Sequence, residues 1–293
     1  MGFHLSRVVM EVVVPPVPET QESPVVSTAP VRRIALCVEY NGAAFRGWQA
    51  QLNQAYPTVQ EALEKVISGV AAHPLRVNCA GRTDAGVHAT WQIVHFDTPA
   101  ERPLRAWVRG ANARLPRQVA VRWAQEVDPE FHARFSATGR RYRYIIHNEP
   151  ARAARLSELA TSHFAPLDAE RMQEAGQYLL GENDFSAYRG ASCQSRTPMR
   201  NVTEVSVRRF GSYVALEIEA NAFLLHMVRN IVGTLLWIGD GRRPPIFMKE
   251  LLDGRDRTKA APTAAPEGLT LVGVRYPEHF GLPQPDLHTP PFL

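Results

Sequence analysis

Hydrophobic and polar residues follow the periods of strands and helices through the first half of the chain. Apolar residues that alternate with polar ones predict strands, and apolar residues spaced three or four apart predict helices. We therefore expect strands over 33–40, 75–79, 91–96 and 119–127, and helices over 58–72 and 105–114. The first of these helices opens with Thr58 and Glu61, which have the spacing of a capping box.

The same order of elements restarts in the second half of the chain. Expected strands cover 141–147, 202–210, 213–219 and 269–276, and expected helices cover 168–180 and 223–238. Each half then reads β-α-β-β-α-β, the ferredoxin-like arrangement that RRM modules resemble. The pattern predicts an α+β fold with two ferredoxin-like (RRM-like) βαββαβ halves, whose sheets join around a central cleft. Such a topology is not in itself evidence of function.

Composition and pattern divide the chain into four segments. We expect residues 1–31 to be a disordered leader, because the apolar run over 12–14 is too short for a signal peptide and prolines follow it. Residues 32–135 are expected to form the N-terminal α+β half, and residues 136–280 the C-terminal one. Residues 281–293 are a proline-rich tail, for which irregular structure is expected.

The composition limits the class of protein. The 293 residues are 45% hydrophobic and 21% charged, which is typical of a soluble globular protein. No apolar run approaches the roughly 20 residues of a membrane-spanning helix, so no membrane partner is expected. Cys37, Cys79 and Cys193 are odd in number and form no CxxC pair, which argues against a disulfide framework and a thiolate zinc site. A reducing cytoplasm fits best.

The basic residues are unevenly chosen. The formal net charge is +4, and only Lys65, Lys249 and Lys259 are lysines among 33 basic residues, so 30 are arginines. Arginine suits phosphates and stacks on bases, although an arginine-favouring genome explains the bias equally well. The clusters at 140–143 and 208–209 are better evidence for a nucleic-acid partner, because local density makes an electrostatic footprint.

The strongest candidate for chemistry is the segment AGRTDAGVHA at residues 80–89. It presents one carboxylate, Asp84, between Gly81 and Gly86, which allow a sharp turn and the close approach of a flat ligand. Arg82 lies two residues before this acid, and His88 lies four residues after it. An aspartate in this setting can be a nucleophile, a general base or a helix N-cap.

Alternation in the strand over 141–147 places Tyr142 and Tyr144 on one face and Arg141 and Arg143 on the other. A tyrosine on a strand can stack on a base or belong to the core, and the core is favoured for Tyr144. The arginines, together with the one that precedes them at position 140, are expected to contact phosphates.

Two later segments supply possible partners for Asp84. Arg229 lies in the apolar helix over 223–238, where a buried arginine needs an anionic partner, and Asp84 is a candidate. In the loop before the last strand, Gly268 allows a ligand to approach and Leu269 can pack on a flat ring, although such a loop is more often only a turn.

Other catalytic patterns are absent from the sequence. There is no Walker A loop, no GxGxxG and no GxSxG. His88 and His95 lack the spacing of metal ligands on a helix, so no metal is expected. The nearest acid to Asp84 is Asp97, which gives poor support for a glycosidase with paired carboxylates.

Taken together, these segments resemble the tRNA pseudouridine synthase A family from about residue 32 to the C-terminus. Several motifs in the right order are specific, whereas one alone is not. The matching segments are AGRTDAGVHA (80–89), Gly47 with Trp48 and Gln49, FHARFSATGRRYRYII (131–146), GENDFSAYR (181–189), CQSRTP (193–198), HMVRNIVG (226–233) and EGL (267–269).

The resemblance implies an enzyme that isomerises uridine to pseudouridine at positions 38, 39 and 40 of the tRNA anticodon stem-loop. By motif, Asp84 resembles the family's catalytic nucleophile and Arg229 its ion-pair partner. Tyr142 resembles the residue that stacks on the target base, Leu269 a pocket wall, and Arg82 the arginine that helps to open the base from the stack. The resemblance also implies a homodimer that works without metal or cofactor.

Two other functions compete with this interpretation. Arginine-rich strands and RRM-like topology suggest a non-catalytic RNA-binding protein, although the intact set of Asp84, Tyr142 and Arg229 weighs against it. A glycoside hydrolase that uses Asp84 and releases free uracil is the other. Within the isomerase interpretation, the carboxylate can attack the anomeric carbon of the sugar or add to the base, and the sequence does not choose between these routes.

Overall fold

The structure is a computed structural model that describes residues 30–50 and 57–285. Only the last two residues of the expected leader over 1–31 fall within this range. Of the expected tail over 281–293, only residues 281–285 do. The rest of both segments lies outside the described residues.

One ten-stranded sheet runs through the described part of the chain. Its strands are β1 (Arg32–Tyr40), β2 (Asn78–Cys79), β3 (His88–Thr98), β4 (Val119–Val127), β5 (Gly139–His147), β6 (Thr161–Ser162), β7 (Gly181–Asp184), β8 (Met199–Phe210), β9 (Tyr213–Ala220) and β10 (Leu269–Arg275). They follow the order β4-β1-β3-β10-β5-β9-β8-β7, while β2 pairs with β3 and β6 pairs with β5. Within residues 30–50 and 57–285, only the pairs β10–β3 and β5–β6 are parallel.

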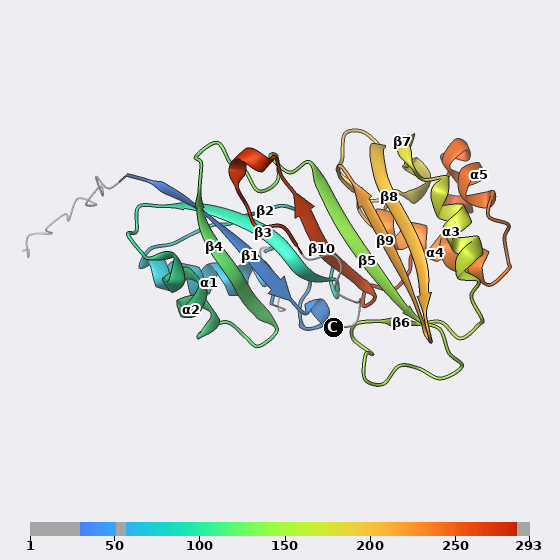
Figure 1. The fold of residues 1–293 in the computed structure, drawn as a ribbon, viewed down its shortest axis with the longest axis horizontal. Coiled ribbons are helices and arrows are strands. Elements are labelled where there is room, and N and C mark those ends of the chain that lie inside the picture. Colours follow the sequence, from blue (N-terminus) through green and yellow to red (C-terminus); the bar gives the residue numbers. More distant parts are fainter. Residues whose placement is uncertain (1–29, 51–56, 286–293) are drawn as a thin grey trace, which may run out of the picture.

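The α-helices lie in two groups at opposite ends of the sheet (Figure 1). At one end, α1 (Val59–Ala71) packs against α2 (Leu104–Asn112), and α2 packs on β4. At the other end, α3 (Ala169–Gln177) packs on β8 and contacts α4 (Met227–Gly239) and α5 (Phe247–Gly254). The fold is therefore a mixture of α and β structure around a large, mostly antiparallel sheet. Every helix within residues 30–50 and 57–285 is too short or too polar to cross a membrane.

Local chemistry explains why α1 begins where the sequence predicts. The Thr58 hydroxyl accepts a hydrogen bond from the Glu61 amide (3.3 Å), and the Glu61 carboxylate accepts one from the Thr58 amide (3.1 Å). This reciprocal pair is a capping box, worth about 1 kcal/mol of helix stability through the Thr58 cap alone.

The strand expected over 75–79 is wrong for most of its length, since β2 covers only Asn78–Cys79. Leu75 and Val77 are buried as a strand pattern suggests. Their amides, however, donate to side chains of α1, namely Ser68 Oγ (2.8 Å) and Glu64 Oε1 (2.9 Å). Because these donors are taken by the helix, this segment cannot extend the sheet ladder.

The helix expected over 223–238 begins four residues later, at Met227. In the segment before it, the Leu225 amide donates to Cys193 Sγ (3.5 Å) and the Leu225 carbonyl accepts from the Gly190 amide (2.8 Å). Leu225 is thus bonded to a neighbouring loop, and the segment over 222–225 lines a cavity. The sequence also missed α5, β6 and β7, which are too short to show a clear period.

Candidate active site

The loop that carries Asp84 joins β2 to β3, and the segment after β1 supports it. Gly86 has φ +78° and Gly47 has φ +87°, both in the left-handed region that glycine tolerates. A Cβ at Gly47 would lie 2.8 Å from the Thr83 carbonyl oxygen, and the Trp48 amide donates to that oxygen over 3.0 Å. The two backbones therefore touch, and this contact fixes the position of Asp84.

Two side chains from the C-terminal part of the chain converge on the Asp84 carboxylate. Its Oδ2 lies 3.0 Å from Nη1 of Arg229 and 3.5 Å from Nε2 of His226. The Nε of Arg229 also donates to the Ala264 carbonyl over 2.8 Å, which fixes the guanidinium from a second side. The structure thus brings together Asp84 and Arg229, which are 145 residues apart in sequence. Both side chains contact the same carboxylate oxygen.

Sequence reasoning missed His226. Its φ of +60° places a non-glycine residue in the left-handed region, directly before α4. Such strain, which costs on the order of 1 kcal/mol, is often found at functional sites. The available signal was a polar residue at the end of the apolar segment over 222–225, immediately before the helix that carries Arg229.

A cavity of about 910 Å³ opens beside Asp84 and is lined by both halves of the chain. The rings of Tyr142 and Phe223 meet edge-on within it, with centroids 5.1 Å apart and planes at 88°. Leu269 and Met227 add further apolar surface. Burial raises the pKa of the Tyr142 hydroxyl, and the charge of Asp84 acts in the same direction. Tyr142 therefore stays neutral beside the carboxylate, with a ring suited to stacking.

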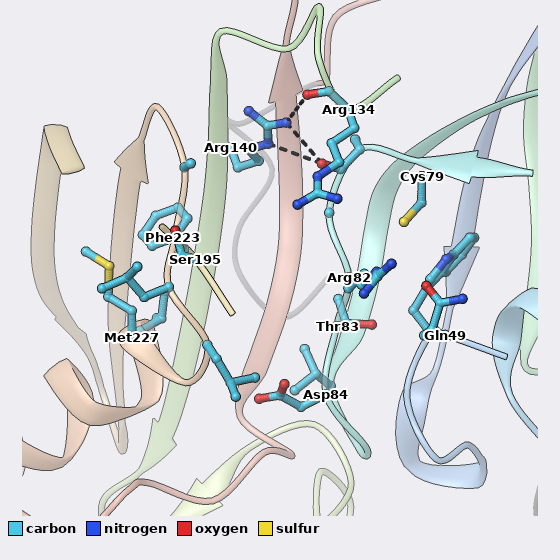
Figure 2. A pocket seen from close by; sticks show the side chains of 18 of the residues that line it. Gln49, Cys79, Arg82, Thr83, Asp84, Arg134, Arg140, Ser195, Phe223 and Met227 are labelled. Atoms are coloured by element: carbon cyan, nitrogen blue, oxygen red, sulfur yellow. Dashed lines mark hydrogen bonds between the residues drawn. The ribbon is translucent and has the colours of Figure 1, made fainter. Parts of the chain in front are cut away.

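The remaining wall of the cavity is strongly basic. Its arginines are Arg76, Arg82, Arg134, Arg140, Arg200 and Arg229. Among the described residues that line this cavity, Asp84 is the only acid. Figure 2 shows Arg82 between Asp84 and Arg134 on one side of the cavity. The Arg82 side chain is exposed, so an anionic ligand can reach it.

Arg140 has a structural position instead of the expected phosphate contact. It is only 8% exposed, and its guanidinium donates to the carbonyls of Ala80 and Asn221, from the two halves of the chain. It also donates to the carbonyls of Arg134 (2.6 Å) and Ala137 (3.0 Å), as Figure 2 shows in part. Arg140 therefore holds the two walls of the cavity together at this end.

The phosphate contacts expected for Arg141 and Arg143 are also wrong, for a different reason. Arg141 lies on the face of β5 opposite Tyr142 and is paired with Glu204 (2.6 Å) and Glu217 (2.7 Å). Arg143 is paired with Glu217 as well (2.7 Å). These guanidinium groups are mostly buried among carboxylates, so they are not available to RNA.

The loop before β10 packs against protein, which corrects the expectation that Gly268 admits a ligand. A Cβ at Gly268 would lie 2.6 Å from the ring of Tyr144. Tyr144 is fully buried and donates to the Ala265 carbonyl (2.7 Å), which confirms its place in the core. The glycine is needed for this packing, and it places the side chain of Leu269 on the cavity wall.

His88 is a structural residue of the same region. It is 3% exposed, its Nδ1 accepts from the Gly42 amide (3.0 Å), and its Nε2 lies 3.1 Å from the Glu267 carbonyl oxygen. Burial lowers the pKa of this histidine, so it is neutral and its Nε2 donates. Nowhere in residues 30–50 and 57–285 do three or more His, Cys, Asp or Glu side chains gather as a metal site.

The chain is similar to known tRNA pseudouridine synthases over most of its length. A family model described as tRNA pseudouridine synthase matches residues 36–136 and 175–277. A tRNA pseudouridine synthase A of Tolumonas auensis is 56% identical over 255 residues, which cover 87% of this chain and 97% of that protein. One of Vibrio cholerae is 57% identical over 252 residues, with 86% and 95% covered.

A solved structure titled as the archaeal box H/ACA sRNP Nop10-Cbf5 complex also matches. It is 12% identical and has a TM-score of 0.33, with 69% of this chain and 44% of that chain covered. With so low an identity and TM-score, this structure says nothing about the site.

Proposed function

Because this chain belongs to the tRNA pseudouridine synthase A family and so isomerises uridine in tRNA, we propose that Asp84 is the nucleophile of that reaction. One observation carries the proposal. Asp84 is the only carboxylate among the described residues of the cavity, and Arg229 holds one of its oxygens at 3.0 Å. We further propose that the substrate uridines lie at positions 38, 39 and 40 of the anticodon stem-loop.

The reaction requires a nucleophile that can also act as a leaving group. The bond between C1′ and N1 of the uridine breaks, the uracil turns, and C1′ bonds to C5. C5 then loses its proton to water, and N1 takes up a proton in its place. Because Arg229 and His226 both contact Oδ2, we assign the attack to Oδ1 of Asp84. Oδ1 can form a transient bond to C1′ or to the base, and either route returns the carboxylate unchanged.

The other side chains of the cavity suit a uracil ring taken out of the RNA stack. Extrusion of the base costs a few kcal/mol, which an aromatic and apolar pocket can offset. We propose that Tyr142 stacks on the target base and that Leu269 forms the opposite wall. Arg82, exposed between Asp84 and Arg134, is proposed to help hold the RNA open. We expect the bound RNA to close this cavity and so to keep water from the broken glycoside.

We also propose that the fold consists of two ferredoxin-like halves around this site. In the first half, β2 pairs with β3 at the inner end of the order β4-β1-β3, and the second half runs β10-β5-β9-β8. Numbered within each half, with β6 and β7 left out of the second, both orders read fourth, first, third, second. This symmetry supports the domain limits 32–135 and 136–280.

A homodimer in the cytoplasm is part of the same proposal and rests on the family resemblance.

The variant Asp84→Asn tests the assignment, since the amide keeps the shape and removes the nucleophile. We expect pseudouridine formation to fall by at least about 10⁴-fold. The readouts are tritium release from tRNA labelled at uridine C5 and binding of the same tRNA, which should survive. Asp253→Asn, at an exposed aspartate of α5 outside the cavity, is the matched control and should leave both unchanged.

Three outcomes would contradict the proposal. Pseudouridine formed by Asp84→Asn at a near-normal rate would remove Asp84 from the chemistry. Free uracil released by the wild-type enzyme, in place of pseudouridine, would indicate a glycoside hydrolase. Binding that is insensitive to Asp84, with no product from either chain, would favour the non-catalytic RNA-binding function.

A further inference from the structure

An aromatic ring stands exposed at the edge of the catalytic cavity. Phe135 has 77% of its surface exposed, although it lines the same cavity as Asp84. A large apolar side chain left in water beside a binding site is informative, since burial of such a ring stabilises a protein by roughly 1.5–3 kcal/mol. Neither the proposed nucleophile nor the proposed pocket for the target base requires Phe135.

The loop that presents Phe135 is well ordered by hydrogen bonds. The amides of Arg134 and Phe135 both donate to Nδ1 of His132 (3.1 and 3.2 Å), and the His132 amide donates to Ser136 Oγ (2.9 Å). Arg140 restrains this loop further, because its guanidinium donates to the Arg134 carbonyl over 2.6 Å. The exposed ring is thus presented by a fixed backbone, which lowers the entropy cost of binding.

The immediate neighbours of Phe135 are those of a base-stacking site. The His132 ring lies 4.4 Å from the Phe135 ring, with planes tilted by 32°. The Arg134 guanidinium lies 5.7 Å from the Phe135 centroid. An exposed aromatic ring beside an arginine is the combination with which proteins bind unpaired bases and their phosphates.

The ring is separate from the place of the reaction. In Figure 2, Arg134, the residue next to Phe135 in the chain, lies at the opposite end of the view from Asp84, with Arg82 between them. Tyr142 and Phe223 already provide the aromatic surface of the target pocket. A base at Phe135 is therefore a neighbour of the target uridine, not the target itself.

We propose that Phe135, flanked by His132 and Arg134, stacks on an unpaired nucleobase that neighbours the target uridine in the RNA. This inference rests on the proposed function, because it takes RNA to be the occupant of the cavity. The site anchors the strand at one end of the cavity while Asp84 acts at the other. Any of the four bases can stack at this site, since every base has a flat face.

The test measures binding of an anticodon stem-loop RNA hairpin in the Asp84→Asn background, where turnover does not interfere. We expect Phe135→Ala to raise the Kd by about 5- to 100-fold, Phe135→Leu to do nearly the same, and Phe135→Trp to restore binding. With 2-aminopurine placed beside the target uridine, stacking should quench its fluorescence, and the quench should disappear in Phe135→Ala. Phe164→Ala, at another exposed phenylalanine outside the cavity, is the matched control.

Several results would overturn the stacking site. One is an unchanged Kd and quench in Phe135→Ala. Another is a change of Phe135→Ala to a smaller oligomer in sedimentation with normal RNA binding, which would place the ring between two copies of the chain. Failure of the hairpin to bind the wild-type protein would contradict RNA as the occupant of the cavity. An active Asp84→Asn enzyme, in contrast, would overturn only the proposed nucleophile, because the stacking test reads binding.

Discussion

The two faces of β5 both carry arginines, but they differ in how far acidic residues neutralise the positive charge. On the face with Tyr142, the cavity gathers several arginines around a single acid, Asp84. On the other face, Arg141 and Arg143 are matched by Glu204, Glu217 and Glu219 within bonding distance. The first arrangement leaves an excess of positive charge for an anionic ligand, and the second neutralises itself. An arginine cluster in a sequence therefore predicts an RNA contact only where no acids face it.

The largest effect that separates the two faces concerns stability. Arg141→Met should lower the free energy of unfolding by about 3 kcal/mol, because the buried Glu217 and Glu219 would lose one cationic partner and keep only Arg143 and Arg275. Urea unfolding followed by circular dichroism measures it. Arg208→Met, at an exposed arginine of β8, should change stability by less than about 0.5 kcal/mol. Equal effects of the two substitutions would contradict a self-neutralising network.

The next effect concerns catalysis on the cavity face. Arg229→Lys should reduce kcat by about 100-fold, since lysine cannot hold Asp84 and the Ala264 carbonyl together in one planar group. The tritium-release rate at saturating tRNA measures it, and KM should change little. Arg208→Lys is the control outside the cavity. A large rise in KM with normal kcat would mean that Arg229 binds RNA and does not position Asp84.

A smaller effect concerns RNA binding. Arg82→Ala should weaken tRNA binding a few-fold and reduce the slope of log Kd against log salt by about 0.7, because one phosphate contact is lost. Arg143→Met, on the opposite face of β5, should leave that slope unchanged when measured on folded protein. The contrast between the two faces fails if both variants reduce the slope equally.

The smallest effect is the pH dependence of stability from Glu217. Burial acts to raise the pKa of this carboxyl, but hydrogen bonds and charge from Arg141 and Arg143 outweigh it and hold the pKa below its usual value. The contribution to stability is then complete above the usual glutamate pKa and is lost as the pH falls toward the lower, folded-state value. Thermal melts across this acidic range should show a shallower decline for Glu217→Gln than for the wild type. Parallel declines would exclude this linkage.

Much of the element order could be predicted from sequence because local periods carry it. The strand over 119–127 and the capping box at Thr58 depend on neighbouring residues, and both predictions are confirmed. The segment at 75–77 failed because its amides bond to side chains of α1, which no local pattern encodes. The late start of α4 has the same origin, in bonds from Leu225 to a loop some thirty residues away.

The site was only partly predictable for a similar reason. The sequence alone identifies the motif around Asp84 and the isolated charge of Arg229 in an apolar helix. The structure brings these two residues together. The pairing of Arg141 with Glu204 and Glu217 depends on the register of β5, β9 and β8, so it is visible only once the strands are aligned. His226 shows its strained backbone only in three dimensions.

The place of β10 has a consequence for how the enzyme comes into being. The strand lies at the centre of the sheet, between β3 and β5, yet residues 30–268 leave the ribosome before it. Until β10 arrives, the two halves lack their shared seam and the cavity lacks Leu269. Pairing across such distances is slow and costly in loop entropy, so assembly of the seam should be the late step of folding. We therefore expect a chain that still lacks β10 to be inactive toward RNA, because its cavity is incomplete.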